Sequence, residues 1–433
     1  MKNVLKLLAA LTIFAVIATV IVSCGNTEVS ETSAETKPVT EKAETKNTEE
    51  TQTPENEIKK TDYSKYFTYK EFELPTDFRQ AAIDYMLEAA NVVWYCGQDF
   101  STSENFEAQG WGISLDYKKG EEYHGLPYAN SYSTVEEFER YLDPQRRFNT
   151  SPDKWLGKAW QSIPGLECAS SVITSLAHFA DIHGYSVAFC PFEKSFQAIP
   201  LGDYTYNEEM VSTYDITNAN KPAKMNECYS LLQKGDVIMH MNEKRAAHVR
   251  MIHDNHVEKK SDGSIVGRKS YVTTIEQTNK FDAQRKDGVK TTWYVDHTYT
   301  YEDLFSDGYV PSTIKEYTEG NTIPMYIGLT REINADDLAE GAFVGSVETN
   351  SYFRFLLFEI FNKDGSIAAR YAKHNTLDYD DSQPGTSSQK MDFRKYAPRL
   401  FEDLASGEYT FVLTAGIPAG EAELARVDFT YAK

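Results

Sequence analysis

The stretch Gly165-Leu166-Glu167-Cys168-Ala169-Ser170-Ser171-Val172 marks the point where a turn gives way to a helix. Val172, Leu176 and Phe179 continue it at the spacing of one apolar helix face. We therefore expect Cys168 in the first turn of a buried helix, where unpaired backbone N–H groups and the positive end of the helix dipole favour a thiolate. The competing interpretation is a small apolar core residue, because free cysteines are often buried and inert.

A set of strands follows this helix along the chain. The predicted strands are Gly235–Met241, which is entered through a turn, Ala246–Ile252, Tyr271–Thr278 and Trp293–Tyr301, with a polar hairpin loop at Asn242–Arg245. One helix followed by antiparallel strands predicts the α+β fold class. Between them, Ser186–Phe189 and Gln197–Pro200 are predicted to be short extended segments, and Lys221–Leu232 a helix.

Three polar residues on these elements fit thiol catalysis. A thiol nucleophile needs a base that takes its proton and a third group that orients the base. Cys168 begins the helix, His248 lies on the second strand, and Glu276 lies on the third. Strand alternation directs Glu276 toward His248 while Ile275 packs inward, and Gln277 replaces Glu276 only if the register shifts by one residue.

The sequence around these residues resembles that of the NlpC-like and CHAP-type cysteine peptidases and amidases of bacterial cell walls, which have a papain-like fold. The resemblance covers about residues 154–327. It is carried by Glu167-Cys168-Ala169-Ser170, where the family has Asp-Cys-Ser-Gly, and by Lys234-Gly235-Asp236-Val237-Ile238, Ala247-His248-Val249-Arg250-Met251 and Ile275-Glu276-Gln277-Thr278. Trp155-Leu156-Gly157 stands near the family's Tyr-x-Trp-Gly segment but lacks the tyrosine.

The resemblance implies that Cys168 is the nucleophile, His248 the base and Glu276 the orienting residue. An oxyanion would need N–H donors, and the backbone of Cys168 at the helix N-terminus offers one. Gln161, seven residues upstream, lies near where papain-like enzymes place an amide donor. A solvated loop glutamine is the competing interpretation of Gln161. The Ala169-Ser170 departure affects contacts with substrate rather than the three catalytic positions.

The N-terminus has the features of an export signal. Met1–Ser23 has Lys2 and Lys6 before an apolar run, and small residues close it. The cysteine at the cleavage point resembles a bacterial lipobox, which implies that Cys24 carries lipid and anchors the chain to the membrane. A retained signal anchor is the alternative. Residues 24–60 are rich in Thr and Glu, with too few apolar residues to fold, and predict a disordered tether.

Charge and cysteine content exclude several function classes. The formal net charge of −21 argues against nucleic-acid binding and against adhesion to anionic lipid. The cysteines of the folded part, Cys96, Cys168, Cys190 and Cys228, form no Cys-x-x-Cys pair. A Cys190–Cys228 disulfide is compatible with export but is not fixed by sequence. No histidine spacing matches a metal site, and no cofactor is implied.

Two further regions flank the predicted peptidase domain at residues 154–330. Residues 61–153 form an aromatic-rich N-terminal region with helices predicted from Phe78 and from Ser133, either a separate domain or an extension of the core. Residues 331–433 predict a β-sandwich. Ser406-Gly407-Glu408-Tyr409 resembles a late strand of immunoglobulin-like domains.

These features together predict a lipid-anchored cysteine peptidase or amidase of the bacterial cell envelope. Its expected substrate is an amide bond in peptidoglycan stem peptides or crosslinks. Two alternatives remain open: a catalytically weak module of the same fold that binds wall peptides, and a thiol-dependent acyl or amide transferase.

Overall fold

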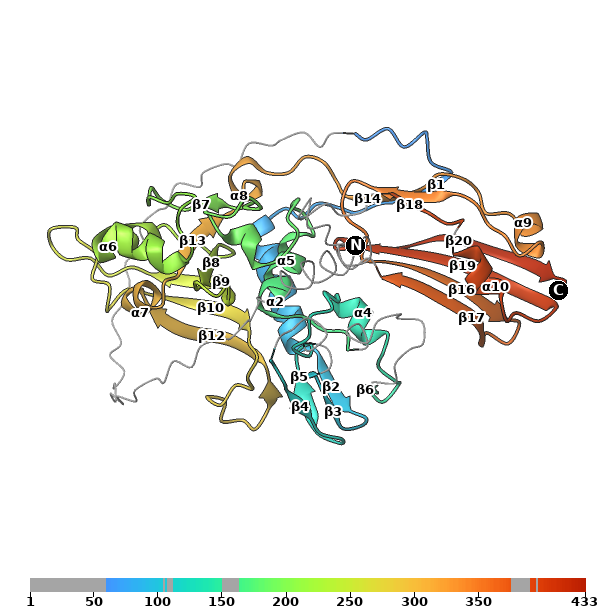
Figure 1. The fold of residues 1–433 in the computed structure, drawn as a ribbon, viewed down its shortest axis with the longest axis horizontal. Coiled ribbons are helices and arrows are strands. Elements are labelled where there is room, and N and C mark those ends of the chain that lie inside the picture. Colours follow the sequence, from blue (N-terminus) through green and yellow to red (C-terminus); the bar gives the residue numbers. More distant parts are fainter. Residues whose placement is uncertain (1–59, 104–105, 107–111, 150–162, 375–389, 395) are drawn as a thin grey trace, which may run out of the picture.

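The computed structural model describes residues 60–103, 106, 112–149, 163–374, 390–394 and 396–433 (Figure 1). Helices occur together with antiparallel sheets, which confirms the predicted α+β class. In the view of Figure 1, a six-stranded sheet lies on the left, a strand-rich C-terminal part on the right, and helices α2 and α5 between them.

The six-stranded sheet is antiparallel throughout, in the order β12-β10-β9-β8-β13-β7. Its members are β7 (Ile199–Pro200), β8 (Val237–Met241), β9 (Ala247–His256), β10 (Tyr271–Gln277), β12 (Trp293–Thr300) and β13 (Val310–Thr313). The polar turn between β8 and β9 gives the predicted hairpin, with Met241 opposite Ala247. The strand and hairpin predictions are therefore confirmed in this part of the chain.

Alternation along the strands gives the sheet two differently packed faces. Met239, Val249 and Met251 share a core with α2 (Phe78–Asn91) and α5 (Cys168–Leu176). Ile238 and Ile252 point the other way, into a smaller core with α6 (Thr213–Tyr229) and α7 (Tyr301–Ser306).

The N-terminal region shares the core of the six-stranded sheet. Helix α2 begins at Phe78, as predicted, after the cap residue Asp77, whose side chain accepts from the Gln80 N–H, and it packs against α5. Trp94 and Phe138 belong to the same core. The region's other elements are β2 (Val93–Cys96), β3 (Phe100–Ser101), β4 (Asp116–Tyr117), β5 (Glu122–His124), α4 (Val135–Glu139) and β6 (Arg147–Phe148), with β11 (Lys290–Thr291) pairing β5. Of the two arrangements left open by the sequence, the structure has an extension packed on the core.

Two four-stranded sheets enclose a separate core in the C-terminal part. One sheet has the order β17-β16-β19-β20 and the other β1-β14-β15-β18. The strands are β1 (Thr68–Glu71), β14 (Tyr326–Leu329), β15 (Ser346–Thr349), β16 (Phe355–Asn362), β17 (Ile367–His374), β18 (Lys390–Asp392), β19 (Gly407–Ile417) and β20 (Gly420–Tyr431). This sandwich starts earlier along the chain than the sequence indicated, at β14, and it includes β1 from the N-terminal region.

Local predictions failed in two segments. Ser186–Phe189 is a 3-10 helix (η2) instead of an extended segment. Helix α6 begins at Thr213, eight residues before the predicted start, because Ser212 and Asp215 form a capping box there. Lys221, where the helix was predicted to start, is instead a kink inside α6: it has φ 67 and precedes Pro222. The remaining short helices are α8 (Glu316–Glu319), α9 (Ala335–Ala339) and α10 (Ala397–Phe401).

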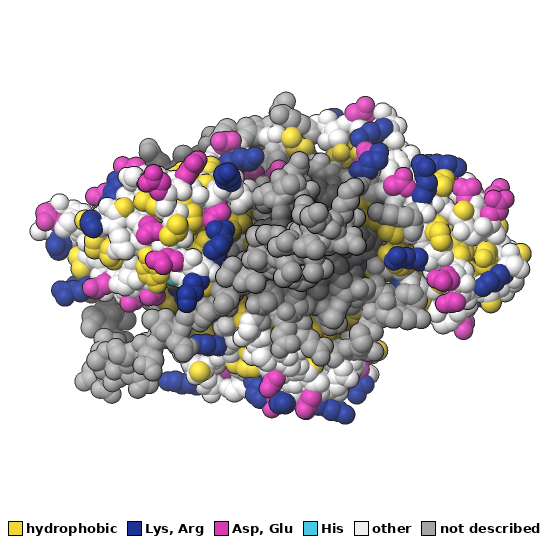
Figure 2. Space-filling view, viewed as in Figure 1, with side chains coloured by type: hydrophobic (Ala, Val, Ile, Leu, Met, Phe, Trp, Pro, Cys, Tyr) yellow, Lys and Arg dark blue, Asp and Glu magenta, His cyan; other side chains and the backbone are white. Residues whose placement is uncertain are grey.

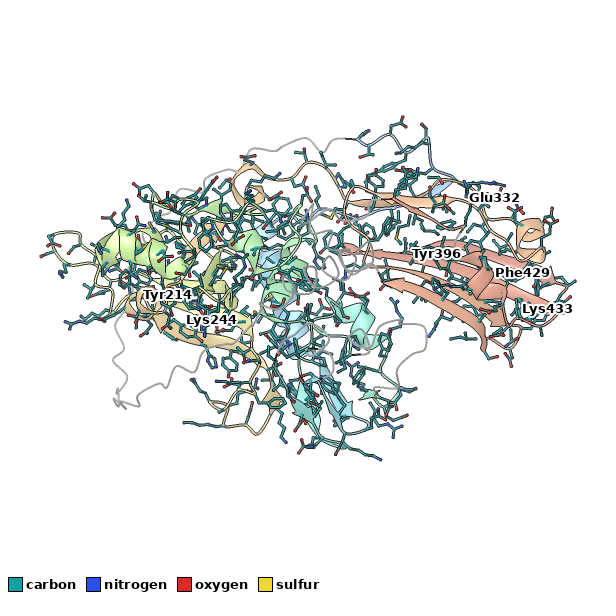
Figure 3. The ribbon with its side chains drawn as sticks, viewed as in Figure 1. Tyr214, Lys244, Glu332, Tyr396, Phe429 and Lys433 are labelled. Carbon is teal, nitrogen blue, oxygen red and sulfur yellow. The ribbon has the colours of Figure 1, made fainter. Side chains whose placement is uncertain are left out.

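The surface carries interspersed acidic and basic side chains on the face drawn in Figure 2. Within the described ranges, no helix has the length and apolar character needed to cross a membrane. Tyr214 of α6 and Lys244 of the β8–β9 turn lie at the opposite end of the view from Phe429 and Lys433 of the sandwich (Figure 3).

Candidate active site

Cys168 is the first residue of α5, as the sequence predicts. Glu167 caps the helix: its carboxylate accepts from the Ala169 N–H at 3.0 Å and the Ser170 N–H at 2.7 Å. Ser170 Oγ accepts in return from the Glu167 N–H at 2.7 Å. A Cβ on Gly165 would lie 2.3 Å from the Pro127 carbonyl oxygen, so only glycine lets the chain turn into this helix so close to residue 127.

The Cys168 thiol lies between a carboxylate and the start of β9. Its S–H donates to Glu167 Oε2 at 3.1 Å, and Sγ is 3.9 Å from the carbonyl oxygen of Ala247. Ala247 is the first residue of β9 and immediately precedes His248. Cys168 is only 2 % exposed. The helix N-terminus therefore meets the main chain of the strand that carries the predicted base.

His248 and Glu276 are brought together across neighbouring strands. His248 Nε2 is hydrogen-bonded to Glu276 Oε2, while Ile275 packs into the core shared with α5. Strand alternation predicted that Glu276 points toward His248 and Ile275 into the core, and both do so. The register of β10 shifts on each side of Thr274, against β9 and against β12, without changing this orientation. By alternation, His248 lies on the face of β9 that also carries Arg250 and Ile252, which is opposite to the face that packs on α5. The structure therefore brings His248 to Glu276, but it brings Cys168 only to the main chain of β9.

Glu276 is fully buried and accepts hydrogen bonds at both oxygens. Oε2 accepts from Arg250 Nε at 2.8 Å as well as from His248, and Oε1 accepts from Tyr299 OH at 2.7 Å and Thr274 Oγ1 at 3.2 Å. Burial raises the pKa of this carboxyl, but the Arg250 charge and the hydrogen bonds from His248 and Tyr299 together hold it well below its usual range. The side chain is thus a fixed carboxylate.

Arg250 is the site residue that the sequence interpretation missed. Its guanidinium lies over the ring of Tyr299, 3.8 Å from the centroid, and over that of Tyr309, at 4.4 Å. A signal was available, because Arg250 stands two residues after His248 and therefore on the same face of the strand. Glu167 was also missed: besides capping α5, it is the acceptor for the Cys168 thiol.

Three further residues were proposed for the site from the sequence. Gln277 Nε2 donates to the Leu126 carbonyl oxygen at 2.8 Å, on the face of β10 opposite to Glu276, so the alternative third residue is not the partner of His248. Gln161, the predicted oxyanion donor, and Cys24, the predicted lipidation site, lie outside the described residues.

His240 stands directly opposite His248 on β8. Its ring contacts Tyr214 and Tyr309, and burial lowers its pKa to about 4, so it is neutral near pH 7. His253 bonds Asp296 on the opposite face of β9, as its parity predicts. Among the described residues, no group of three or more His, Cys, Asp or Glu side chains is arranged to hold a metal ion.

The other three described cysteines are buried and free, so the Cys190–Cys228 disulfide that the sequence left open is not formed. Burial raises the pKa of Cys96 to about 11 and raises that of Cys228 as well. A Cβ on Gly202 would lie 2.6 Å from the Cys228 sulfur, which shows how closely the chain encloses this thiol. These thiols are structural by position, in contrast to Cys168 at its helix terminus.

Comparison with known proteins adds no further assignment: no protein-family model matches this chain, and no curated protein matches it.

Proposed function

We propose that this protein is a cysteine hydrolase that cleaves amide bonds with Cys168 as nucleophile, His248 as base and Glu276 as orienting residue. One relationship carries the proposal: the His248 ring is held by Glu276 at Nε2, and the Cys168 sulfur lies against Ala247, the residue before His248. The order of the helix and the three strands supports assigning residues 163–327 to a papain-like domain of the NlpC or CHAP type.

The chemistry follows from which ring nitrogen Glu276 holds. Because Nε2 faces Glu276, proton exchange with the thiol is assigned to Nδ1, which is itself buried. Nδ1 takes the thiol proton as sulfur attacks the amide carbon, and returns it to the leaving amine when the C–N bond breaks. Water then hydrolyses the thioester. The Cys168 backbone N–H at the start of α5 is the oxyanion donor we assign.

The proposed substrate is a peptide of the bacterial cell wall, and the proposed location is the envelope. These proposals rest on the export signal, the cysteine at position 24 and the Thr- and Glu-rich segment that follows it. The C-terminal sandwich is proposed to be immunoglobulin-like and to carry no catalytic group.

The test incubates the full chain with purified wall fragments and with synthetic stem peptides. Cleavage is measured as the appearance of new amino termini. Cys168→Ser should lower kcat/KM at least about 10³-fold, since nucleophile and base act as a unit. Cys96→Ser is the matched control, because its hydroxyl can still donate to the Gln98 carbonyl as the thiol does. Full turnover in Cys168→Ser would overturn the proposal. An added amine acceptor that captures the acyl group would assign transfer instead of hydrolysis.

A second candidate function is a binding module without turnover. It is favoured by the thiol's hydrogen bond to Glu167 and by its 2 % exposure, both of which oppose thiolate formation. Sedimentation of the full chain with insoluble wall material separates the two candidates. Wild-type protein that binds fragments and releases no new amino termini would make binding the function.

A further inference from the structure

A cavity of about 810 Å³ lies beside the turn that leads into β9. It is lined by residues from 187–195, which follow α5, from 206–208, and by Arg245 of the β8–β9 turn. Arg245 stands two residues before Ala247, so their Cα atoms are about 7 Å apart at most. The Ala247 carbonyl oxygen is 3.9 Å from the Cys168 sulfur. The cavity has the size of an ordinary ligand pocket and is within reach of a short peptide chain that also meets the thiol.

The backbone of Arg245 has φ 63, in the left-handed region where glycine is the ordinary residue. The turn is closed by other groups: the Arg245 N–H donates to the Asn242 carbonyl oxygen at 2.8 Å, and the Asn242 side chain accepts from the N–H groups of Lys244 and Ala246. The Arg245 guanidinium instead donates to Glu193 Oε1 at 2.6 Å. A long cationic side chain thus stands where glycine would form the same turn with less strain, and strain of this kind is typical of functional sites.

The cavity carries charges of both signs and an exposed aromatic ring. Arg245 and Glu193 form an ion pair with side chains 44 % and 18 % exposed. Lys194 and Glu208 are exposed, and neither has an ion-pair partner among the described residues. The Tyr206 ring is 38 % exposed. Opposite charges that line one cavity are complementary to a ligand that carries both signs, and the ring offers a surface for an aliphatic part.

We propose that this cavity is a peptide-binding subsite for a chain end that carries an ammonium and a carboxylate within one residue of each other. Arg245 and Lys194 bind the carboxylate, and Glu193 positions the guanidinium. Glu208 binds the ammonium, and Tyr206 packs against the aliphatic chain. The inference rests on the proposed function, in which the rest of the same peptide reaches the nucleophile.

The experiment uses an N-acetylated tripeptide of two alanines and a C-terminal lysine, whose last residue supplies both charges. Its C-terminal amide lacks the carboxylate, and its ε-acetylated form lacks the ammonium. Binding is measured as Kd by saturation-transfer NMR on the full chain carrying Cys168→Ser, so that no probe is cleaved. Arg245→Gly and Glu208→Gln are added to this parent chain. Lys244→Ala is the matched control, because Lys244, labelled in Figure 3, is a cation of the same turn that does not line the cavity.

Each capped probe should bind the parent chain about three- to tenfold more weakly than the free probe, the range expected for partly exposed charge pairs. Arg245→Gly should bind the free and amidated probes equally, and Glu208→Gln the free and ε-acetylated probes equally. Lys244→Ala should match the parent. Because glycine suits φ 63, Arg245→Gly should keep the urea midpoint of the parent, which separates a binding role from a role in the turn.

The proposal is overturned if the free probe does not bind saturably up to about 10 mM. Equal binding of the three probes by the parent, or an undiminished preference for the carboxylate in Arg245→Gly, overturns it as well. If Arg245→Gly does not fold, the three probes on the parent chain decide alone.

The wild-type chain separates this inference from the proposed function. Charge-selective binding without release of new amino termini from any wall peptide would keep the subsite and remove the hydrolase. Cleavage of wall peptides that responds neither to a C-terminal amide nor to Arg245→Gly would keep the hydrolase and remove the subsite.

Discussion

Arg354 of the sandwich and Glu137 of α4 form a buried ion pair with 3.0 Å between Nη2 and Oε2, across a separation of 217 residues. Their side chains are 5 % and 6 % exposed. Glu137 also completes the capping box of α4 with Thr134. The pair fastens the C-terminal sandwich to the region that packs on the Cys168 helix.

Arg354→Met should destabilise the protein by about 3–5 kcal/mol, because it leaves a buried carboxylate without its counter-charge. Urea unfolding of the full chain at pH 7 measures the change. Adding Glu137→Gln to that variant should recover a large part of the loss, since the amide can still cap α4. A single substitution that costs under 1 kcal/mol would show that the pair is not buried in solution.

A chain that ends at Thr330 should fold poorly. The truncation removes Arg354 and also strands β15 to β20, which leaves Glu137 uncompensated and the sheet of β1 and β14 without its other strands. A truncated chain with wild-type near-ultraviolet circular dichroism would contradict this prediction.

Glu276→Gln should reduce turnover less than His248→Ala does. The amide can still accept from the ring, but it no longer carries charge, and it leaves Arg250 buried without its carboxylate. We expect about a 10–100-fold loss in kcat for Glu276→Gln against 10³-fold or more for His248→Ala, in assays of wall-fragment cleavage. Equal losses would mean that Glu276 acts in the proton transfer itself.

Stability should fall in mild acid because of His240. Its pKa is about 4 in the folded chain and about 6.5 when unfolded, so the unfolded state takes up the proton first. The contribution of His240 is complete above pH 6.5 and declines as pH falls toward 4, by about 3 kcal/mol in all. His178 is partly buried, and its pKa is also lowered by desolvation, so it acts in the same direction.

His240→Phe should therefore flatten the loss of stability between pH 7.5 and 4.5, measured as the shift of the urea midpoint. His256→Phe is the control, because His256 is exposed at the end of β9. An unchanged slope in His240→Phe would place the acid sensitivity elsewhere.

Cys96, Cys190 and Cys228 should remain reduced and unmodified in the native protein. Each is buried, and burial raises the pKa of each thiol. Mass spectrometry after alkylation at pH 8 should find them unlabelled in native protein and fully labelled in urea. Recovery of a Cys190–Cys228 disulfide from protein exported in bacteria would contradict the structure.

Sequence alone was sufficient where the signals are local. A few neighbouring residues are enough to indicate the start of α2, the turn before Cys168 and the polar loop between β8 and β9. The pairing of His248 with Glu276 also follows from local information, since it needs only strand alternation and neighbouring strands.

The missed features depend on distant contacts. Nothing near Thr68–Glu71 indicates that this segment pairs with Tyr326–Leu329, because the two are brought together only by the folded chain. Arg250 was missed for a different reason. Its position two residues after His248 could be read from the sequence, but its contacts could not, because Tyr299 comes from β12 and Tyr309 from the segment before β13.

The pairing of β1 with β14 also determines how the molecule responds to a mechanical load. β1 is an edge strand of the sandwich, and the chain continues from it into α2. A pull on the chain ahead of Thr68 is directed along β1 and loads the β1–β14 hydrogen bonds in shear before any tension reaches α2 or the Cys168 helix packed against it. The sandwich therefore takes up such a load ahead of the part of the molecule that holds Cys168, through the four residue pairs of the β1–β14 ladder.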